Sequence, residues 1–174
     1  MRKTVGLIIC SVLFITISCN NKPIETFELS IVDFDYSLAY SVLYKLTNEK
    51  LTITFRGELE NEKDSVLYST IDLPKDKIRQ LSNINIDSLS VLYSNVCIRD
   101  GDIKSFRFTK NGKTKIVTLE NYYHPELSPS IEIINGIVPE KFRMFNNKVE
   151  LIKRMENCGE FKIIKSWGEN KKEK

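Results

Sequence analysis

The chain has 174 residues, of which 41% are hydrophobic and 28% charged, and its formal net charge is +3. That length suits one domain, which at this size can bury about 68–70% of its unfolded surface. Two of the 26 basic residues lie in the first 18 positions, so the remainder carries 24 basic against 23 acidic residues. A nearly neutral chain argues against nucleic acid as a partner and against a polybasic membrane patch, because both need a basic face.

The first 18 residues have the three parts of an export signal. Arg2 and Lys3 form a positive start, Val5–Ile17 is largely apolar, and the small residue Ser18 precedes Cys19. The apolar run is shorter than the roughly 20 residues that a membrane-spanning helix needs, and it stops in polar residues. We therefore expect a cleaved signal peptide here.

The end of this segment, Thr16-Ile17-Ser18-Cys19, resembles the lipobox of bacterial lipoproteins. In that family, diacylglycerol is attached to the cysteine thiol and cleavage makes the cysteine the first residue. Thr16 departs from the family pattern, which usually has Leu at this position. The resemblance implies lipid on Cys19. The alternatives are a secretory signal cut near Ser18, which leaves Cys19 free, and an uncleaved anchor helix.

The residues after the cysteine bear on location. In this family an Asp directly after the cysteine implies retention at the inner membrane, and this chain has Asn20. Residues 20–25 also lack the acidic run that marks surface export in some lipoproteins. The resemblance therefore implies an outer-membrane protein of the cell envelope that faces the periplasm, joined to its anchor by a short tether, residues 19–25.

Hydrophobic residues alternate with polar ones through the next part of the chain. Such alternation is typical of half-buried strands, and we expect four of them. They are placed near 26–34, at 40–46, at 51–55 after the polar turn 47–50, and at 66–71.

A helix is expected to begin at Asp72 or Leu73, with Pro74 in its first turn and Ile78 and Leu81 on one face. A short amphipathic piece is expected over residues 87–93.

Asn111-Gly112 lies between two β-rich runs. Both residues tolerate the positive φ of a type I′ turn, so the pattern predicts a β-hairpin. Pairing Lys110 with Lys113 places Phe106 opposite Val117 on one face, with Phe108 and Leu119 flanking them.

Two further helices are expected. The first opens at Ser128-Pro129, carries Ile131, Ile134 and Ile137, and stops before Pro139. The second begins at Asn147, with Glu150 as its capping-box partner, Val149, Ile152 and Met155 as its buried stripe, and Gly159 as its left-handed cap.

The order of elements predicts an α+β domain over residues 26–165, followed by a frayed polar tail, 166–174. We expect an antiparallel sheet of about six strands built from hairpins, with two to three helices on one face. The stretch 72–142 is also similar to uncharacterised envelope lipoproteins of Bacteroides-type bacteria. The shared features are the helix after "VLYST" (66–70), the NG hairpin, the Tyr122-Tyr123 pair and an isoleucine-rich helix. This similarity implies an envelope location and fold type, and no activity.

Two of the four cysteines remain after Cys10 leaves with the signal and Cys19 takes lipid. Cys97 and Cys158 are therefore expected to form one disulfide in the oxidising envelope. The alternative is two separate buried thiols, because free cysteine behaves as a small hydrophobic residue.

Catalytic and metal motifs are weak. His124 is the only histidine, no Gly-x-Ser-x-Gly elbow is present, and Cys97 with His124 could form a dyad only as a free thiol. The run Arg99–Asp102 has two acidic residues with glycine between them, which fits a tight turn better than a calcium loop. One histidine and two paired cysteines argue against zinc, and there is no glycine-rich phosphate loop. We expect no catalytic residues, no metal and no cofactor.

Surface recognition is the remaining expectation. Arg99, Tyr122, Tyr123 and His124 are residue types that anchor protein interfaces, and a disulfide at Cys97 would stiffen their surroundings. The alternative is that these aromatics cap the core. The expected function is therefore that of a lipid-anchored, non-catalytic protein that binds a protein partner, as an immunity-type inhibitor or an accessory subunit. An envelope enzyme with an unrecognised site and a small-molecule binder are the alternatives.

Overall fold

The computed structural model describes residues 23–35, 40–56, 61–99 and 101–167. The expected signal peptide, Cys19 and most of the expected tail lie outside these residues. The strands are β1 (Phe27–Asp35), β2 (Tyr40–Thr47), β3 (Leu51–Arg56), β4 (Ser65–Thr70), β5 (Leu92–Asn95), β6 (Ile103–Lys110), β7 (Lys113–Glu120) and β8 (Phe161–Ile164). The helices are α1 (Lys75–Ser82), α2 (Ser128–Ile137) and α3 (Lys148–Cys158), with single 3₁₀ turns η1 (Ile86–Ser88) and η2 (Glu140–Phe142).

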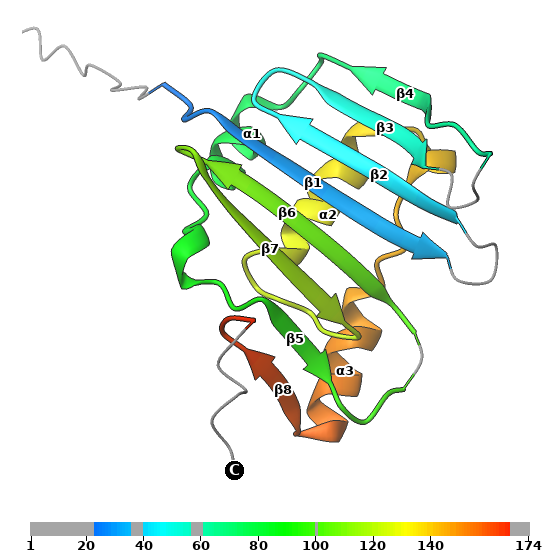
Figure 1. The fold of residues 1–174 in the computed structure, drawn as a ribbon, viewed down its shortest axis with the longest axis vertical. Coiled ribbons are helices and arrows are strands. Elements are labelled where there is room, and N and C mark those ends of the chain that lie inside the picture. The colour runs from blue at the N-terminus through cyan, green and yellow to red at the C-terminus, as the bar shows by residue number, and fades with distance from the viewer. Residues whose placement is uncertain (1–22, 36–39, 57–60, 100, 168–174) are drawn as a thin grey trace, which may run out of the picture.

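The strands form one sheet in the order β4-β3-β2-β1-β6-β7-β5-β8 (Figure 1). The expected α+β class is confirmed, but two details were wrong. The described residues form eight strands instead of about six, and the sheet is mixed because β5 runs parallel to β7. Strand β5 lies at the β7 edge of the β6–β7 hairpin and not beside β6, the next strand in the chain.

The four strands expected from alternation are present, and alternation decides their faces. Strand β1 buries Phe27, Leu29 and Ile31, while β6 buries Phe106 and Phe108 beside them. These side chains belong to one core, which also holds the inward residues of β2, β3 and β7. The opposite face of the sheet carries the polar half of the pattern.

The Asn111-Gly112 hairpin is confirmed. Both residues have positive φ, 50° and 73°, and the register pairs Lys110 with Lys113 and Phe106 with Val117. The β6–β7 hairpin then adds to β1, not to β2 or β3, which places β1 at the centre of the sheet.

The helices lie behind the sheet in the view of Figure 1, with α2 crossing the central strands. Helix α2 begins at Ser128 and ends before Pro139 as predicted, with Ile131 and Ile134 buried. Helix α1 begins directly after Pro74, which caps it and does not lie inside its first turn. Ile78 of α1 belongs to the same core, so both helices cover one face.

Helix α3 has the predicted caps. The side chain of Asn147 accepts a hydrogen bond from the Glu150 N–H, and Gly159 has φ 70°. The Glu150 carboxylate does not return to the cap, because it binds Arg154 one turn later. The predicted stripe was wrong at Val149, whose side chain is 78% exposed, whereas Leu151 is buried.

Two short strands were not predicted. The expected amphipathic piece at 87–93 instead contains the end of η1 and the start of β5, whose four residues are all buried. A strand covered on both faces has no alternation to reveal it. Strand β8, a four-residue edge strand, lies just before the expected tail.

Within the described ranges, no helix combines the length and apolar character needed to cross a bilayer.

Candidate functional site

His124 lies in the segment that connects β7 to α2, and its side chain is buried. Its Nδ1 accepts hydrogen bonds from the backbone N–H groups of Glu126 at 3.2 Å and Leu127 at 3.3 Å. The His124 N–H donates to Ser128 Oγ at 2.9 Å. An Nδ1 that accepts bonds leaves the proton on Nε2 in the neutral ring. Burial lowers the pKa of His124, with a smaller opposing effect from Glu126. The imidazole therefore organises the start of α2.

The aromatic residues beside it form a connected cluster. The Tyr93 ring contacts His124 at 4.5 Å and Tyr122 at 5.4 Å between centroids. Tyr122 meets Phe161 of β8 edge-on at 5.5 Å. Burial, and secondarily Tyr93, raises the pKa of Tyr122. The structure thus brings together two of the predicted partner-binding residues, Tyr122 and His124, and packs them against β5 and β8.

Tyr123 and Arg99 are placed differently. The Tyr123 N–H points at Met155 Sδ at 3.1 Å, and Lys148 Nζ lies 5.0 Å from the centre of its ring. Arg99 is exposed. Across the described residues, no hydrogen bond, ion pair or ring contact joins Arg99 to the three aromatic residues predicted with it.

The turn at Gly101 and Asp102 packs on Asn121. The Asp102 N–H donates to Asn121 Oδ1 at 3.0 Å, and the Asn121 N–H returns a bond to the Asp102 carbonyl at 2.8 Å. At Gly101, with φ 146°, a Cβ would stand 2.2 Å from Asn121 Oδ1, so this close approach requires glycine. Asp100 lies outside the described residues. No group of three or more His, Cys, Asp or Glu in the described ranges could hold a metal ion.

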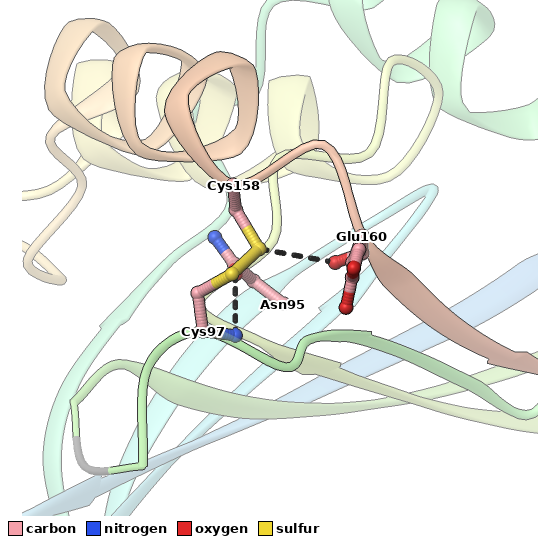
Figure 2. Close-up of a disulfide and its surroundings, with 4 residues drawn as sticks. All are labelled: Asn95, Cys97, Cys158 and Glu160. Atoms are coloured by element: carbon pink, nitrogen blue, oxygen red, sulfur yellow. Dashed lines mark hydrogen bonds between the residues drawn. A yellow bond between two sulfur atoms is a disulfide. The ribbon is translucent and has the colours of Figure 1, made fainter.

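The two cysteines expected to pair lie within disulfide distance (Figure 2). The Cα atoms of Cys97 and Cys158 are 5.8 Å apart, and the bond ties the turn after β5 to the end of α3. Asn95 supports this turn by accepting a hydrogen bond from the Cys97 N–H at 3.1 Å. A sulfur held in this bond is not a nucleophile, so the geometry does not support a Cys97–His124 dyad.

A buried lysine and two carboxylates meet at the β1–β6 pair. The Lys104 side chain is 2% exposed, and its ammonium contacts Asp102 and lies 3.2 Å from Asp33, which stands opposite Lys104 across the β1–β6 pair. Tyr44 donates a hydrogen bond to the Phe142 carbonyl at 2.9 Å. Burial, with a contribution from Asp33, raises the pKa of Tyr44. This cluster neutralises a buried lysine.

The face of the sheet away from the helices carries a hollow that the sequence did not reveal. Its volume is about 510 Å³, and we call it the sheet hollow. Side chains of five strands line it: Glu28, Ser30 and Val32 from β1, Leu43 and Lys45 from β2, Arg56 from β3, Ser105 and Arg107 from β6, and Ile116 from β7.

Charged side chains stand on either side of a nearly buried serine in the sheet hollow. Ser30 is 8% exposed and is flanked in register by Lys45 on β2 and Arg107 on β6. Lys45 forms an ion pair with Glu28 at 2.7 Å. Arg56 and Arg107 are exposed, and neither forms an ion pair in the part of the chain that the structure describes. Two guanidinium groups are therefore available to a ligand.

The alternation could have indicated these outward side chains strand by strand. It could not show that β1 lies between β2 and β6, and this adjacency is what brings Lys45 and Arg107 to either side of Ser30.

No known family model matches the sequence, and no curated protein matches it significantly.

Proposed function

We propose that this chain is a lipoprotein of the cell envelope, anchored through Cys19 at the periplasmic face of the outer membrane, and that it binds a protein partner. The sheet hollow is the single observation that carries the binding proposal. It is a concave surface on the sheet face that the described helices leave open, and two of its arginines form no ion pair with a described residue.

The composition of the sheet hollow supports a protein partner. Interface centres are enriched in arginine and contain apolar side chains, with polar groups around them. Here the exposed Arg107 stands beside Ile116, which is 42% exposed, and the half-buried Val32 and Leu43 lie between the charged residues. Because paired strands carry all of these residues, little ordering is needed on binding, which favours affinity.

The proposed anchor would hold this surface close to the membrane. The tether of residues 19–25 can span at most about 25 Å when fully extended, at 3.3–3.6 Å per residue. An immunity-type inhibitor that intercepts an incoming protein and an accessory subunit of an envelope assembly both suit such a position. The proposal includes no catalytic step, metal or cofactor.

The aromatic cluster remains a second candidate surface for the same function. Phe161 and Ile163 of β8 are 40% and 50% exposed, and Phe161 contacts Tyr122 directly. Tyr123, which is half-buried, contacts Met155 and Lys148 of α3 instead.

Site-specific photo-crosslinking in living cells tests the proposal and separates the two surfaces. A photoreactive residue at position 116 should give a discrete protein adduct, whereas one at Glu132, exposed on α2 behind the sheet, should not. An adduct from position 161 alone would transfer the proposal to the aromatic cluster. Adducts from neither surface, combined with turnover of an envelope polymer by the purified chain, would favour the enzyme alternative.

A further inference from the structure

We infer that the sheet hollow receives an acidic segment of the partner, with carboxylates on either side of an apolar side chain. This inference rests on the proposed function, because it names the chemistry of the partner at the same surface.

The first support is the charge of the sheet hollow. Among the described residues that line it, Lys45, Arg56 and Arg107 are basic and Glu28 alone is acidic, which is a local excess of two positive charges in a chain that is nearly neutral after the signal. The ion pair between Glu28 and Lys45, at 2.7 Å, neutralises the lysine. The excess therefore belongs to the two arginines, whose guanidinium groups can each bind a carboxylate with two parallel hydrogen bonds.

The second support is the spacing of the arginines. Arg107 is two strands from Lys45, with Ser30 between them in register. Arg56 lies on β3, opposite Ser41 of β2, four residues along that strand from Lys45. With strands about 4.8 Å apart and a rise of about 3.4 Å per residue, the Cα atoms of Arg56 and Arg107 are roughly 20 Å apart on a diagonal. One small anion cannot neutralise both, whereas two carboxylates on one segment can.

The floor between the arginines fixes the rest of the chemistry. Val32 and Leu43 face each other across the β1–β2 pair, and Ser105 faces Val32 from β6. This floor offers apolar contact with a hydroxyl beside it. A segment with an apolar residue between acidic residues matches both this floor and the arginines on either side of it.

Shape and overall charge favour such a segment over other anions. A bilayer surface is flat and cannot fill a hollow of about 510 Å³. Nucleic acid carries a charge at every phosphate and is normally met by a broad basic face. An anionic headgroup and an oligonucleotide are accordingly outcomes of the test.

The test uses the full chain purified from membranes in a neutral detergent. The probe is a fluorescent capped peptide, Glu-Glu-Val-Glu-Glu, and its anisotropy reports binding at low salt. The combined substitutions Arg56→Gln and Arg107→Gln should weaken binding by about tenfold or more, because both carboxylate contacts are lost. The matched control is Lys77→Gln with Lys153→Gln, which removes the same charge from exposed positions on α1 and α3 and should leave the affinity unchanged.

Three further probes distinguish an acidic peptide from other ligands of the sheet hollow. The peptide Gln-Gln-Val-Gln-Gln should not bind. A soluble short-chain phosphatidylglycerol and a single-stranded oligonucleotide should bind more weakly than the acidic peptide. Equal weakening in both pairs of variants would mean that only net charge matters and would overturn the inference, as would absent peptide binding or tighter binding of either alternative anion.

The two proposals can fail separately. If position 116 gives its adduct in cells, and that adduct persists in the Arg56→Gln, Arg107→Gln variant while the acidic peptide does not bind, the partner surface stands and its acidic occupant is rejected. If position 116 gives no adduct, the proposed function itself fails at this surface.

Discussion

The two backbone N–H groups that donate to Nδ1 of His124 tie its protonation to folding. Burial lowers the pKa of the folded state below the value of about 6.5 expected for an unfolded chain. The unfolded chain therefore takes up a proton first as the pH falls. The stabilising contribution of neutral His124 is complete above about pH 6.5 and is lost progressively below it, toward the folded pKa.

We expect the free energy of unfolding to fall as the pH drops below about 7, with a slope of at most about 1.4 kcal/mol per pH unit. Denaturant titrations across this range measure it. His124→Asn keeps an acceptor close to the Nδ1 position but does not titrate, and His124 is the only histidine, so this variant should show a flatter profile. An equal pH dependence in both proteins would assign the effect to other groups.

A second prediction for a single residue concerns the stability that Lys104 contributes. Its side chain is 2% exposed, and its ammonium lies between the carboxylates of Asp33 and Asp102. Lys104→Met keeps much of the volume but leaves the acids without their cation, so the domain should lose about 3–5 kcal/mol of stability. Lys113→Met is the control, since the Lys113 side chain is 65% exposed in its ion pair with Asp87 and should contribute at most about 1 kcal/mol. Similar melting temperatures for both variants would contradict this account.

At the same scale, sequence reasoning identified residue types more reliably than their roles. His124 and Tyr122 were expected at an interface, and they do lie together, but the bonds of His124 run to its own turn. Nothing in the sequence indicates that Nδ1 would find two backbone donors. The pairing of Lys104 with Asp33 was also hidden, because it depends on the register between strands far apart in the chain.

Among the elements, the β6–β7 hairpin depends on two residues with positive φ. At Gly112, with φ 73°, any Cβ is strained even though there is space for it. Gly112→Ala should therefore cost about 1–2 kcal/mol. Gly136→Ala makes the same chemical change at an open position in α2, where alanine favours the helix and should be neutral or stabilising. Thermal melts should show a lower melting temperature for Gly112→Ala and an unchanged or higher one for Gly136→Ala, and equal shifts would contradict the assigned turn.

The disulfide is the other element-scale constraint. It closes a chain segment with a sequence separation of 61 and connects α3 to the turn after β5. In the chain-entropy description, a crosslink of this length contributes about 4 kcal/mol at most. We expect a reducing agent to lower the melting temperature of the native chain but not that of the Cys97→Ser, Cys158→Ser variant. Quantitative alkylation of both thiols in the unreduced, unfolded native chain would rule the bond out.

Strands were predictable from the sequence where one face is buried and the run of alternating residues is long. Strands β1, β2, β3, β6 and β7 have six to nine residues each and follow the alternation. Strand β5 has four buried residues, and β8 has four residues at the edge, so neither shows a period. The stripe of α3 was misplaced at Val149 because a helix of this composition offers several apolar faces, and tertiary packing chose the one with Leu151.

For the whole molecule, the arrangement of layers determines which surface is free to bind. All eight strands of the described chain share one sheet, and the helices cover a single face of it (Figure 1). The helix-covered face forms the hydrophobic core, and the other exposes the sheet hollow. The α+β class with helices on one face followed from the order of elements alone. The location of the sheet hollow depends on β6 pairing with β1, which no local pattern encodes.

The proposed anchor concerns the whole domain, because it would hold the sheet face that carries the sheet hollow close to the membrane. Each buried methylene of a lipid contributes about 0.8 kcal/mol, so one acyl chain binds a membrane marginally and two or three bind it stably. A thiol at position 19 is the attachment point that the lipobox resemblance implies, and Cys10 would be removed with the signal. Loss of Cys19 should therefore abolish both lipid attachment and the cleavage that follows it.

We expect Cys19→Ala to lose labelling by a fatty-acid probe and to accumulate as a precursor that retains its first 18 residues. Intact mass and gel mobility measure the retained segment, and fluorescence of the clicked probe measures acylation. Cys10→Ala is the matched control, since it changes the same residue type inside the apolar run and should be labelled and processed like the native chain. If Cys19→Ala is labelled without loss, the lipid lies elsewhere. If the native chain is processed without label, the segment is an ordinary secretory signal, and the domain is released into the periplasm with a free Cys19.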